Sequence, residues 1–115
     1  MISREHKLNI RAVDRAIFMA IKTGRKKIDT RAATVKLCKI KTNDTVVFVC
    51  GREKLKRKVK SARLFKSIAA LLRCYRARQI NPAISSAKEL TKMYYSFPNY
   101  KEKIKKFGLI ALKLN

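Results

Sequence analysis

Acidic residues are scarce in this chain. Seven Asp and Glu stand against thirty Lys and Arg in 115 residues, which gives a formal net charge of +23. A small domain usually carries about 2 to 8 net charges, and self-repulsion on a larger scale destabilises a compact fold unless a partner neutralises it. The imbalance therefore predicts a polyanionic partner. Nucleic acid is favoured because counterion release rewards many cations at once, and an anionic membrane surface is the alternative.

Histidine and closely spaced cysteine are also lacking. The one histidine is His6, and Cys38, Cys50 and Cys74 are too far apart for the C-x-x-C spacing of a metal or redox site. We therefore expect no metal and no cofactor. An odd cysteine count without a signal peptide predicts reduced, buried thiols in a cytoplasmic protein. No apolar run approaches the ~20 residues of a membrane span. Because nucleic acid is favoured over an anionic membrane surface, we expect no membrane partner.

Glycine and proline are few, with three Gly and two Pro, so each is informative as a boundary. Val13, Ala16 and Ile17 begin a helical apolar spacing that continues to Ile21. Gly24 follows this spacing at the place where a helix ends in a left-handed residue. The pattern predicts a helix before Gly24.

Two further helices are predicted between the basic middle of the chain and its end. One begins after Ser67, a suitable N-cap, and is broken at Pro82. The next begins after Ser86, which forms a capping-box pattern with Glu89, and is stopped by Pro98.

Strands are predicted wherever apolar residues alternate or β-branched residues cluster. These segments are residues 6–11, 27–35, 46–50, 52–66 and 107–114. With the three helices they give an α+β fold, a small curved mixed sheet or barrel with about three helices packed against it. At this length we expect residues 1–115 to form a single domain.

The segment "GRKKIDTR" (24–31) combines cations with one acid. Asp29 and Arg31 are two apart, so in a strand their side chains face the same side, and Lys27 joins them if the strand begins there. Lys26 lies at the strand entrance, where spacing does not fix its direction. An arginine fork and a lysine both suit phosphate, so the segment is a reasonable nucleotide pocket. An ordinary ion pair on the rim of the sheet is the alternative.

Two lysine runs form a second kind of signal. In the predicted strand 52–66, Lys54, Lys56, Lys58 and Lys60 alternate with other residues, so one face would be almost wholly lysine. Residues 100–106 add a further run. A solvated face is the ordinary explanation, but the recurrence of such runs favours a phosphate-contacting surface. The residues predicted to bind RNA are Gly24, Arg25, Lys26, Lys27, Asp29, Arg31, Lys54, Lys56, Arg57, Lys58, Lys60, Arg63, Lys103, Lys105 and Lys106.

Aromatic side chains could stack on unpaired bases. Tyr94 and Phe97 lie on the apolar stripe of a predicted helix and are therefore assigned to the core. Tyr95 and Tyr100 are freer to stack, although partly buried packing is the commoner role for such residues.

Four segments in order resemble the ASCH domain family, a branch of the PUA-like fold. "TGRKKIDTR" is similar to the family signature G-x-K-x-x-[ED]-x-R, and "IKTNDTVVF" resembles its "IKxGDxIxF" turn and strand. "VKSARLFKSIAALL" resembles the basic strand that leads into a short helix, and "FPNYKEKIKKFGLIALKL" resembles the closing segment. The resemblance covers nearly the whole chain. It implies a PUA-like β-barrel with a cleft near the G-x-K motif, RNA binding in general, and action on nucleosides or RNA in some members.

The sequence departs from the family pattern in two places. Asn43 stands where the family turn has Gly, and Asn tolerates the same left-handed backbone. The family amidohydrolases that act on acetylated cytidine use a lysine, a threonine three residues later and a subsequent glutamate. Lys26 matches the lysine, Asp29 occupies the threonine position, and "QINPAISS" (79–86) contains no acid. The amidohydrolase set is therefore incomplete.

Two functions of different class follow. The first is an RNA-binding, non-enzymatic module seated on structured RNA, with ribosomal RNA and ribosomal proteins as candidate partners, because a charge of +23 matches that setting. The second is an enzyme acting on RNA or a modified nucleoside, with Lys26 and Asp29 at its centre. A DNA-binding, transcription-linked module is a third, weaker alternative.

Overall fold

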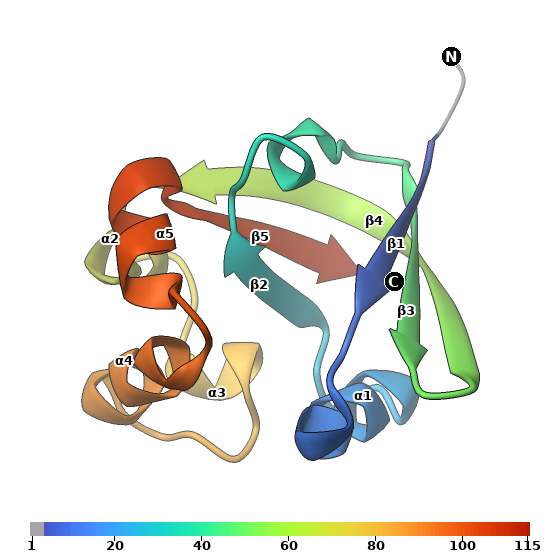
Figure 1. The fold of residues 1–115 in the computed structure, drawn as a ribbon, viewed down its shortest axis with the longest axis horizontal. Helices are drawn as coiled ribbons and strands as arrows, with labels where there is room; N and C mark the ends of the chain where they lie inside the picture. Colours follow the sequence, from blue (N-terminus) through green and yellow to red (C-terminus); the bar gives the residue numbers. More distant parts are fainter. Residues whose placement is uncertain (1–3) are drawn as a thin grey trace.

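Five strands form one curled sheet in the computed structural model, which describes residues 4–115 (Figure 1). The strands are β1 (Glu5–Asn9), β2 (Ile28–Ala32), β3 (Thr45–Cys50), β4 (Glu53–Phe65) and β5 (Leu109–Leu114). The helices are α1 (Arg15–Lys22), α2 (Ile68–Leu72), α3 (Ala77–Ile80), α4 (Ala87–Ser96) and α5 (Tyr100–Phe107), with short 3-10 helices η1 (Ala12–Asp14) and η2 (Leu37–Lys39). The predicted α+β class with a mixed, curved sheet is confirmed.

The strand order β1-β3-β4-β5-β2 leaves β1 and β2 as the two edges of the sheet. β1 runs parallel to β3, and the other neighbours are antiparallel. β4 is long enough to pair with β3 through its first half and with β5 through its second half. A register shift between Val59 and Ser61 separates the halves, and such irregularities bend a strand. The sheet therefore curls into an open half-barrel.

Two apolar cores lie on the two faces of this curled sheet. β5 supplies both, because alternate residues of a strand point to opposite faces. Ile110 and Leu112 join α1 and β3 in the core inside the curl, whereas Leu109 and Ala111 join the core beneath helices α2–α5. In Figure 1 these four helices gather on one side of the sheet and α1 lies apart from them.

The helix before Gly24 differs from its prediction at its start. It begins at Arg15, and Val13 lies in η1 with 80% of its surface exposed. The apolar stripe is therefore shifted, and Phe18 and Ile21 are the large side chains that α1 buries. Gly24 has a φ of +82°, which confirms the left-handed residue predicted after this helix.

The single helix predicted from Ser67 to Pro82 is two helices. Ser67 caps α2 as predicted, its hydroxyl accepting from the amide of Ala70. The chain then turns, and α3 begins after Arg76, whose amide donates to Gln79 Oε1 at 2.8 Å. The break lets Ile80 reach the same core that α2 faces, where it is fully buried. The burial of Ile80 in this core explains why the helix that begins after Ser67 does not continue unbroken to Pro82.

Helix α4 follows its prediction, and helix α5 was missed. Ser86 accepts from the amide of Glu89 at 3.1 Å, and α4 ends before Pro98. The lysine run at 100–106 is helical, although only Ile104 in α5 is buried. Tyr100, Ile104 and Phe107 recur at helical spacing, but the lysines between them suggested a charged run and Phe107 the start of the final strand. The five α-helices found in residues 4–115 therefore exceed the three predicted.

The turn before β3 is organised by a buried carboxylate. Asn43 has a φ of +76°, as its left-handed tolerance predicted. Asp44 accepts hydrogen bonds from the backbone amides of Arg4 and Lys41, each at 3.0 Å, and lies 2.8 Å from His6 Nε2. Burial opposes the charged form, but these hydrogen bonds outweigh it and lower the pKa of Asp44.

The expectation that all three cysteines are buried is wrong for two of them. Cys50 is buried in the core, whereas Cys38 and Cys74 are exposed, and all three are free thiols. Cys38 lies in η2 and Cys74 lies just beyond the end of α2, where the chain runs over the surface. Within residues 4–115, no helix has the length and apolarity to cross a membrane.

Candidate nucleic-acid interface

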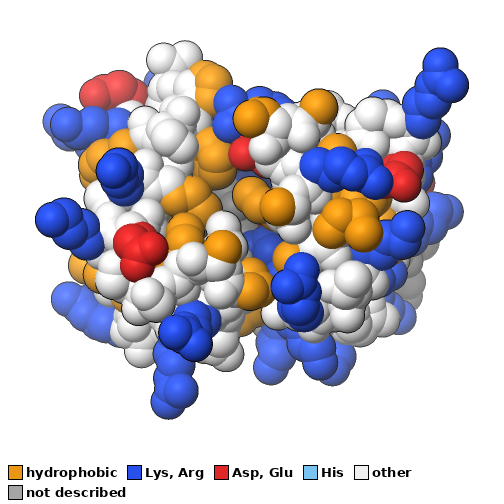
Figure 2. Space-filling model, turned by 90° about the horizontal axis from the view of Figure 1, so that it is seen from below, with side chains coloured by type: hydrophobic (Ala, Val, Ile, Leu, Met, Phe, Trp, Pro, Cys, Tyr) orange, Lys and Arg blue, Asp and Glu red, His pale blue; other side chains and the backbone are white. Residues whose placement is uncertain are grey.

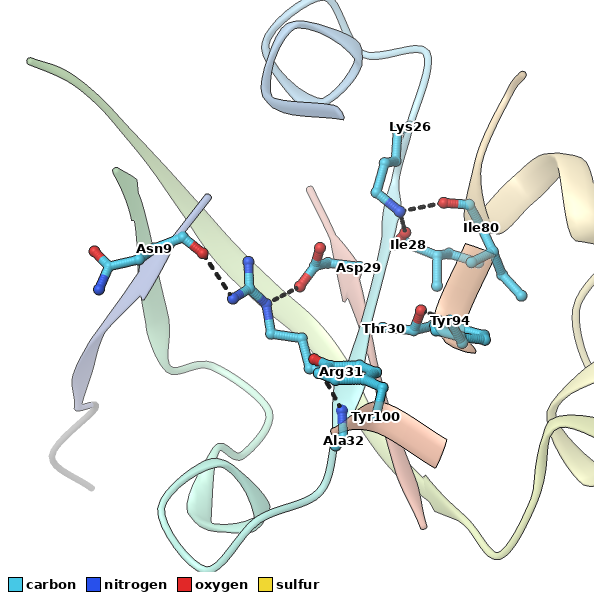
Figure 3. Close-up of polar contacts among 10 residues, drawn as sticks. All are labelled: Asn9, Lys26, Ile28, Asp29, Thr30, Arg31, Ala32, Ile80, Tyr94 and Tyr100. Carbon is cyan, nitrogen blue, oxygen red and sulfur yellow. Dashed lines mark hydrogen bonds and ion pairs between the residues drawn. The ribbon is translucent and has the colours of Figure 1, made fainter. Parts of the chain in front are cut away.

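Arg31 bridges the two edge strands of the half-barrel. Its Nε donates to Asp29 Oδ2 at 2.9 Å and its Nη1 donates to the carbonyl of Asn9, on β1, at 3.0 Å (Figure 3). The guanidinium carbon lies 5.9 Å from the centre of the Phe48 ring. At this point a side chain joins β2 to β1, and we call this junction the seam.

The pair Asp29–Arg31 is enclosed by the fold. The two side chains lie on the same side of β2, as their spacing predicted, and Asp29 is only 4% exposed. Burial opposes the charge of Arg31, but the neighbouring carboxylate outweighs it and raises the pKa of Arg31. This pair is therefore more enclosed and more constrained than an exposed ion pair on the rim of a sheet.

A cavity of about 250 Å³, here called the cleft, opens beside this pair. Its floor is formed by Asp29, Thr30 and Arg31, and its walls come from the end of β1 with η1 and from the junction of α4 with α5. Figure 2 shows a hollow on this side of the molecule, with hydrophobic side chains along its walls and basic side chains within and around it. The sheet edge and the helical layer therefore meet at a concave site.

One wall of the cleft is aromatic. Phe97 and Tyr100 meet edge to face with ring centres 5.1 Å apart, and Tyr100 stacks on Tyr94 at 6.4 Å. On the opposite wall, Arg11 Nε is bonded to Asp14 at 2.8 Å, and its guanidinium carbon lies 5.3 Å from the centre of the Phe97 ring. The prediction that Tyr94 belongs to the core is confirmed. Phe97, assigned to the core as well, is only half-buried and lines the cleft.

Two tyrosine hydroxyls lie at or behind the cleft floor. Tyr100 accepts a long hydrogen bond, 3.4 Å, from the amide of Ala32, which leaves its own proton available. Tyr94 and Thr30 share a hydrogen bond between their hydroxyls. Burial raises the pKa of Tyr94 and of Tyr100, so both phenols stay protonated near neutral pH. The cleft thus offers a guanidinium, a carboxylate and a phenol beside aromatic rings, a set that suits a flat polar ring.

Lys26 points away from the cleft. Its Nζ donates to the carbonyl of Ile28 at 2.7 Å and to the carbonyl of Ile80, and the side chain is 5% exposed (Figure 3). Burial lowers the pKa of Lys26 to about 8, and nearby Asp29 only partly offsets this effect. The structure therefore brings Asp29 and Arg31 together at the cleft and places Lys26 in the interior, as a link between β2 and α3.

The segment 79–86 lies beside Lys26 through this contact with Ile80. The family resemblance places a glutamate in this segment, but no acid occurs in it. A backbone carbonyl is the group that meets the lysine here.

A second hollow, the basic groove, has a volume of about 630 Å³ and is shallow. It brings the end of α1 and Gly24 next to three successive cations of β4, Lys56, Arg57 and Lys58. Arg57 Nη2 donates to the carbonyl of Lys22 at 3.3 Å, which attaches β4 to the end of α1. Residues predicted separately as RNA contacts therefore share one surface.

The lysines of β4 alternate as predicted. Lys54, Lys56, Lys58 and Lys60 are all exposed, and we call these four the lysine row. Within the described residues only Lys56 of the row has an acidic partner, Glu5, at 3.5 Å across an exposed gap. Such a pair contributes roughly 0–1 kcal/mol and does not neutralise the row.

The other predicted contacts are spread over the surface. Arg25, Lys27, Lys105 and Lys106 are exposed and lie outside the cleft. Arg63 is exposed, with its guanidinium 5.4 Å from the centre of the Phe65 ring. Among the lysines of α5, Lys103 alone lines the cleft.

Sequence reasoning missed Asn9 and Arg11. Asn9 takes part through its backbone carbonyl, which leaves no signal in its residue type. Arg11 lies at the end of a predicted strand, and only the contact with Phe97 reveals its place. The three-residue spacing from Arg11 to Asp14 was the local feature that could have predicted an ion pair holding its guanidinium in place.

Comparison with known proteins supports the fold. No family model and no curated protein matches the chain. The crystal structure of hypothetical protein PH0355 is 29% identical, with a TM-score of 0.83, over 96% of this chain and 97% of that one. The solution NMR structure of protein PF0455 from Pyrococcus furiosus is 28% identical, with a TM-score of 0.72, over 99% and 96%. Both are similar to this chain along nearly its whole length, and neither description states an activity.

Proposed function

We propose that this protein is a cytoplasmic RNA-binding protein seated on structured RNA, with ribosomal RNA as the leading candidate, and that it belongs to the ASCH branch of the PUA-like fold. One observation carries the proposal. Only four of the thirty Lys and Arg, namely Arg11, Arg15, Arg31 and Lys56, form ion pairs within residues 4–115. A polyanion that spans several faces neutralises the remainder and releases counterions.

The lysine row and the basic groove supply the backbone-contacting surface in this proposal. A row of ammonium groups on one strand contacts phosphates without reading sequence. The cleft adds stacking and hydrogen-bonding groups that suit one unpaired base. The protein would thus recognise a folded RNA that presents a flipped or looped-out nucleotide near phosphate-rich strands.

A binding experiment tests this directly. We expect nuclease-treated protein to bind a fluorescent stem–loop RNA at physiological salt, with log K falling against log salt at a slope of about −4 to −5 for six phosphate contacts. Replacing the four lysines of the row with Gln should reduce the slope by roughly 3. Replacing Lys39, Lys41, Lys88 and Lys92 removes the same charge elsewhere and serves as the control.

Absence of RNA binding at physiological salt would overturn the proposal. Equal losses of RNA affinity in the two variants would show that binding depends on net charge alone, and would exclude a specific role of the lysine row. A preference for duplex DNA at matched salt would favour the transcription-linked alternative over RNA.

A second function, an enzyme acting on a modified nucleoside or on RNA, would need Lys26. Burial lowers the pKa of Lys26 to about 8, so part of its amine is neutral near that pH, but it acts as a nucleophile or base only if its Nζ leaves the carbonyls of Ile28 and Ile80. If Lys26 performs this role, Lys26→Met should abolish hydrolysis of acetylated cytidine while circular dichroism shows a folded protein. Unchanged turnover in that variant, or no turnover in the wild type, excludes this function.

A further inference from the structure

A further cavity, distinct from the basic groove, has a volume of about 270 Å³ and lies on the other side of Arg31 from the cleft. We call it the seam cavity. It shares Asn9, Arg31, Tyr100 and Lys103 with the cleft, so the two hollows meet along the seam. Its remaining walls come from β1 and from the segment between β2 and η2.

The two hollows differ in chemistry. The cleft contains three cations, Arg11, Arg31 and Lys103, which are offset by two carboxylates, Asp14 and Asp29, and it also has the aromatic side chain of Phe97. The seam cavity is lined by four cations, Lys7, Arg31, Lys36 and Lys103, and by no acid among the described residues. Four cations around one small cavity repel one another, so an anion placed there would remove a cost of the folded state.

Arg31, which lines both hollows, has hydrogen-bonding capacity left for a nucleotide that spans them. Asp29 occupies its Nε and the Asn9 carbonyl occupies its Nη1. Its Nη2 makes no hydrogen bond within residues 4–115. Because Asp29 and Asn9 hold the guanidinium in place, that free end is already oriented before a ligand arrives.

We propose that the seam cavity binds the phosphate of the nucleotide whose base enters the cleft. The inference rests on the proposed function, since the nucleotide is taken to be part of an RNA. Arg31 lies between the two parts of the ligand. The base lies beside Asp29 and the aromatic wall, and the phosphate lies among Lys7, Lys36 and Lys103. The site thus selects a phosphorylated nucleotide over a free nucleoside.

Nuclear magnetic resonance tests this on the whole protein. We would titrate ¹⁵N-labelled protein with the four nucleosides, with their 5′- and 3′-monophosphates, and with inorganic phosphate. A monophosphate should bind about tenfold or more tightly than its nucleoside, as expected for charge-assisted contacts. It should shift the amide signals of Lys7 and Lys36, which line the seam cavity and not the cleft, whereas the nucleoside shifts only signals of the cleft.

A matched pair of variants separates the cavity from general charge. Lys36→Gln with Lys103→Gln should reduce the preference for the monophosphate to less than about threefold. Lys39→Gln with Lys105→Gln changes a lysine close to Lys36 and one on the same helix as Lys103. Both control residues are exposed and line other hollows, so this variant should keep the preference.

The outcomes separate the two proposals. Equal affinity for nucleoside and monophosphate, or equal losses in both variants, overturns the phosphate site even if stem–loop RNA still binds. If monophosphates bind with the expected preference but RNA does not bind at physiological salt, the cavity stands as a site for free nucleotides and the RNA proposal falls. Shifts by inorganic phosphate alone, with no nucleotide preference, show an adventitious ion only and also overturn the inference.

Discussion

Lys26 holds a charged group in the interior against the cost of burial. Its ammonium meets two backbone carbonyls, those of Ile28 and Ile80, which need a donor as much as the lysine needs acceptors. The cost of burying the charge is expressed in a pKa of about 8, against an ordinary value of 10.5. The residue therefore links stability to pH.

We predict a pH-dependent difference in stability between the wild type and Lys26→Met. Between pH 8 and 10 the unfolded chain keeps the Lys26 proton that the folded chain loses, so the wild type gains stability as pH rises. Its free energy of unfolding should increase relative to Lys26→Met by roughly 2 kcal/mol across this window. Tyr94 and Tyr100, whose raised pKa values act in the opposite direction above pH 10, are common to both proteins and cancel.

Urea unfolding at several pH values, on both proteins, measures this difference. A difference that stays constant from pH 7 to pH 10 would show that Lys26 does not change its protonation on unfolding in this window.

Among the elements, the short connection from α5 into β5 fixes how the helical layer meets the sheet. Gly108 lies there with a φ of +75°. A Cβ at this position would be 2.3 Å from the carbonyl oxygen of Phe65, on the neighbouring strand β4. Both the backbone angle and the close approach therefore require glycine.

We predict that Gly108→Ala destabilises the protein more than Gly51→Ala. Gly51 also has a positive φ, +60°, but a Cβ there would have no atom within 4 Å, so the substitution adds only backbone strain of about 1 kcal/mol. Gly108→Ala adds a steric clash with backbone and should cost roughly 2 kcal/mol or more. Thermal unfolding of the two variants compares these losses of stability. Equal decreases in melting temperature would mean that β4 and α5 move apart to admit the methyl group without destabilising the fold.

Elements with a local signal could be predicted from the sequence. Alternation predicted β4 almost to the residue. The caps Ser67 and Ser86 were recognised because the hydrogen bond of an N-cap involves only the first turn of its own helix. Helix α5 was missed although Tyr100, Ile104 and Phe107 have helical spacing, because the lysines between them suggested a charged run. The division into α2 and α3 was missed because it places Ile80 in a core that includes residues far from it in the sequence.

The candidate site could be predicted only in part. The pair Asp29–Arg31 followed from strand periodicity, two residues apart. The bond from Arg31 to Asn9 spans 22 residues and that from Lys26 to Ile80 spans 54. Such contacts depend on how the sheet curls and on where α3 packs. Neither can be inferred from the spacing of residues along one sequence.

At the scale of the whole molecule, charge and shape act together. The net charge of +23 is distributed over exposed cations on β4, α4, α5 and the loops, whereas two of the seven acids, Asp29 and Asp44, are buried in the pairs Asp29–Arg31 and Asp44–His6. The acids stabilise the fold, and the excess cations remain available to a partner. This division is what a protein enclosed by RNA phosphates requires.

Sedimentation of the native protein from cell lysate on a density gradient tests the central claim most directly. The account predicts that the protein travels with a ribosomal particle at low and at higher salt, and that ribonuclease treatment releases it. A protein that remains at the top of the gradient at both salt concentrations would contradict a resident place on structured RNA.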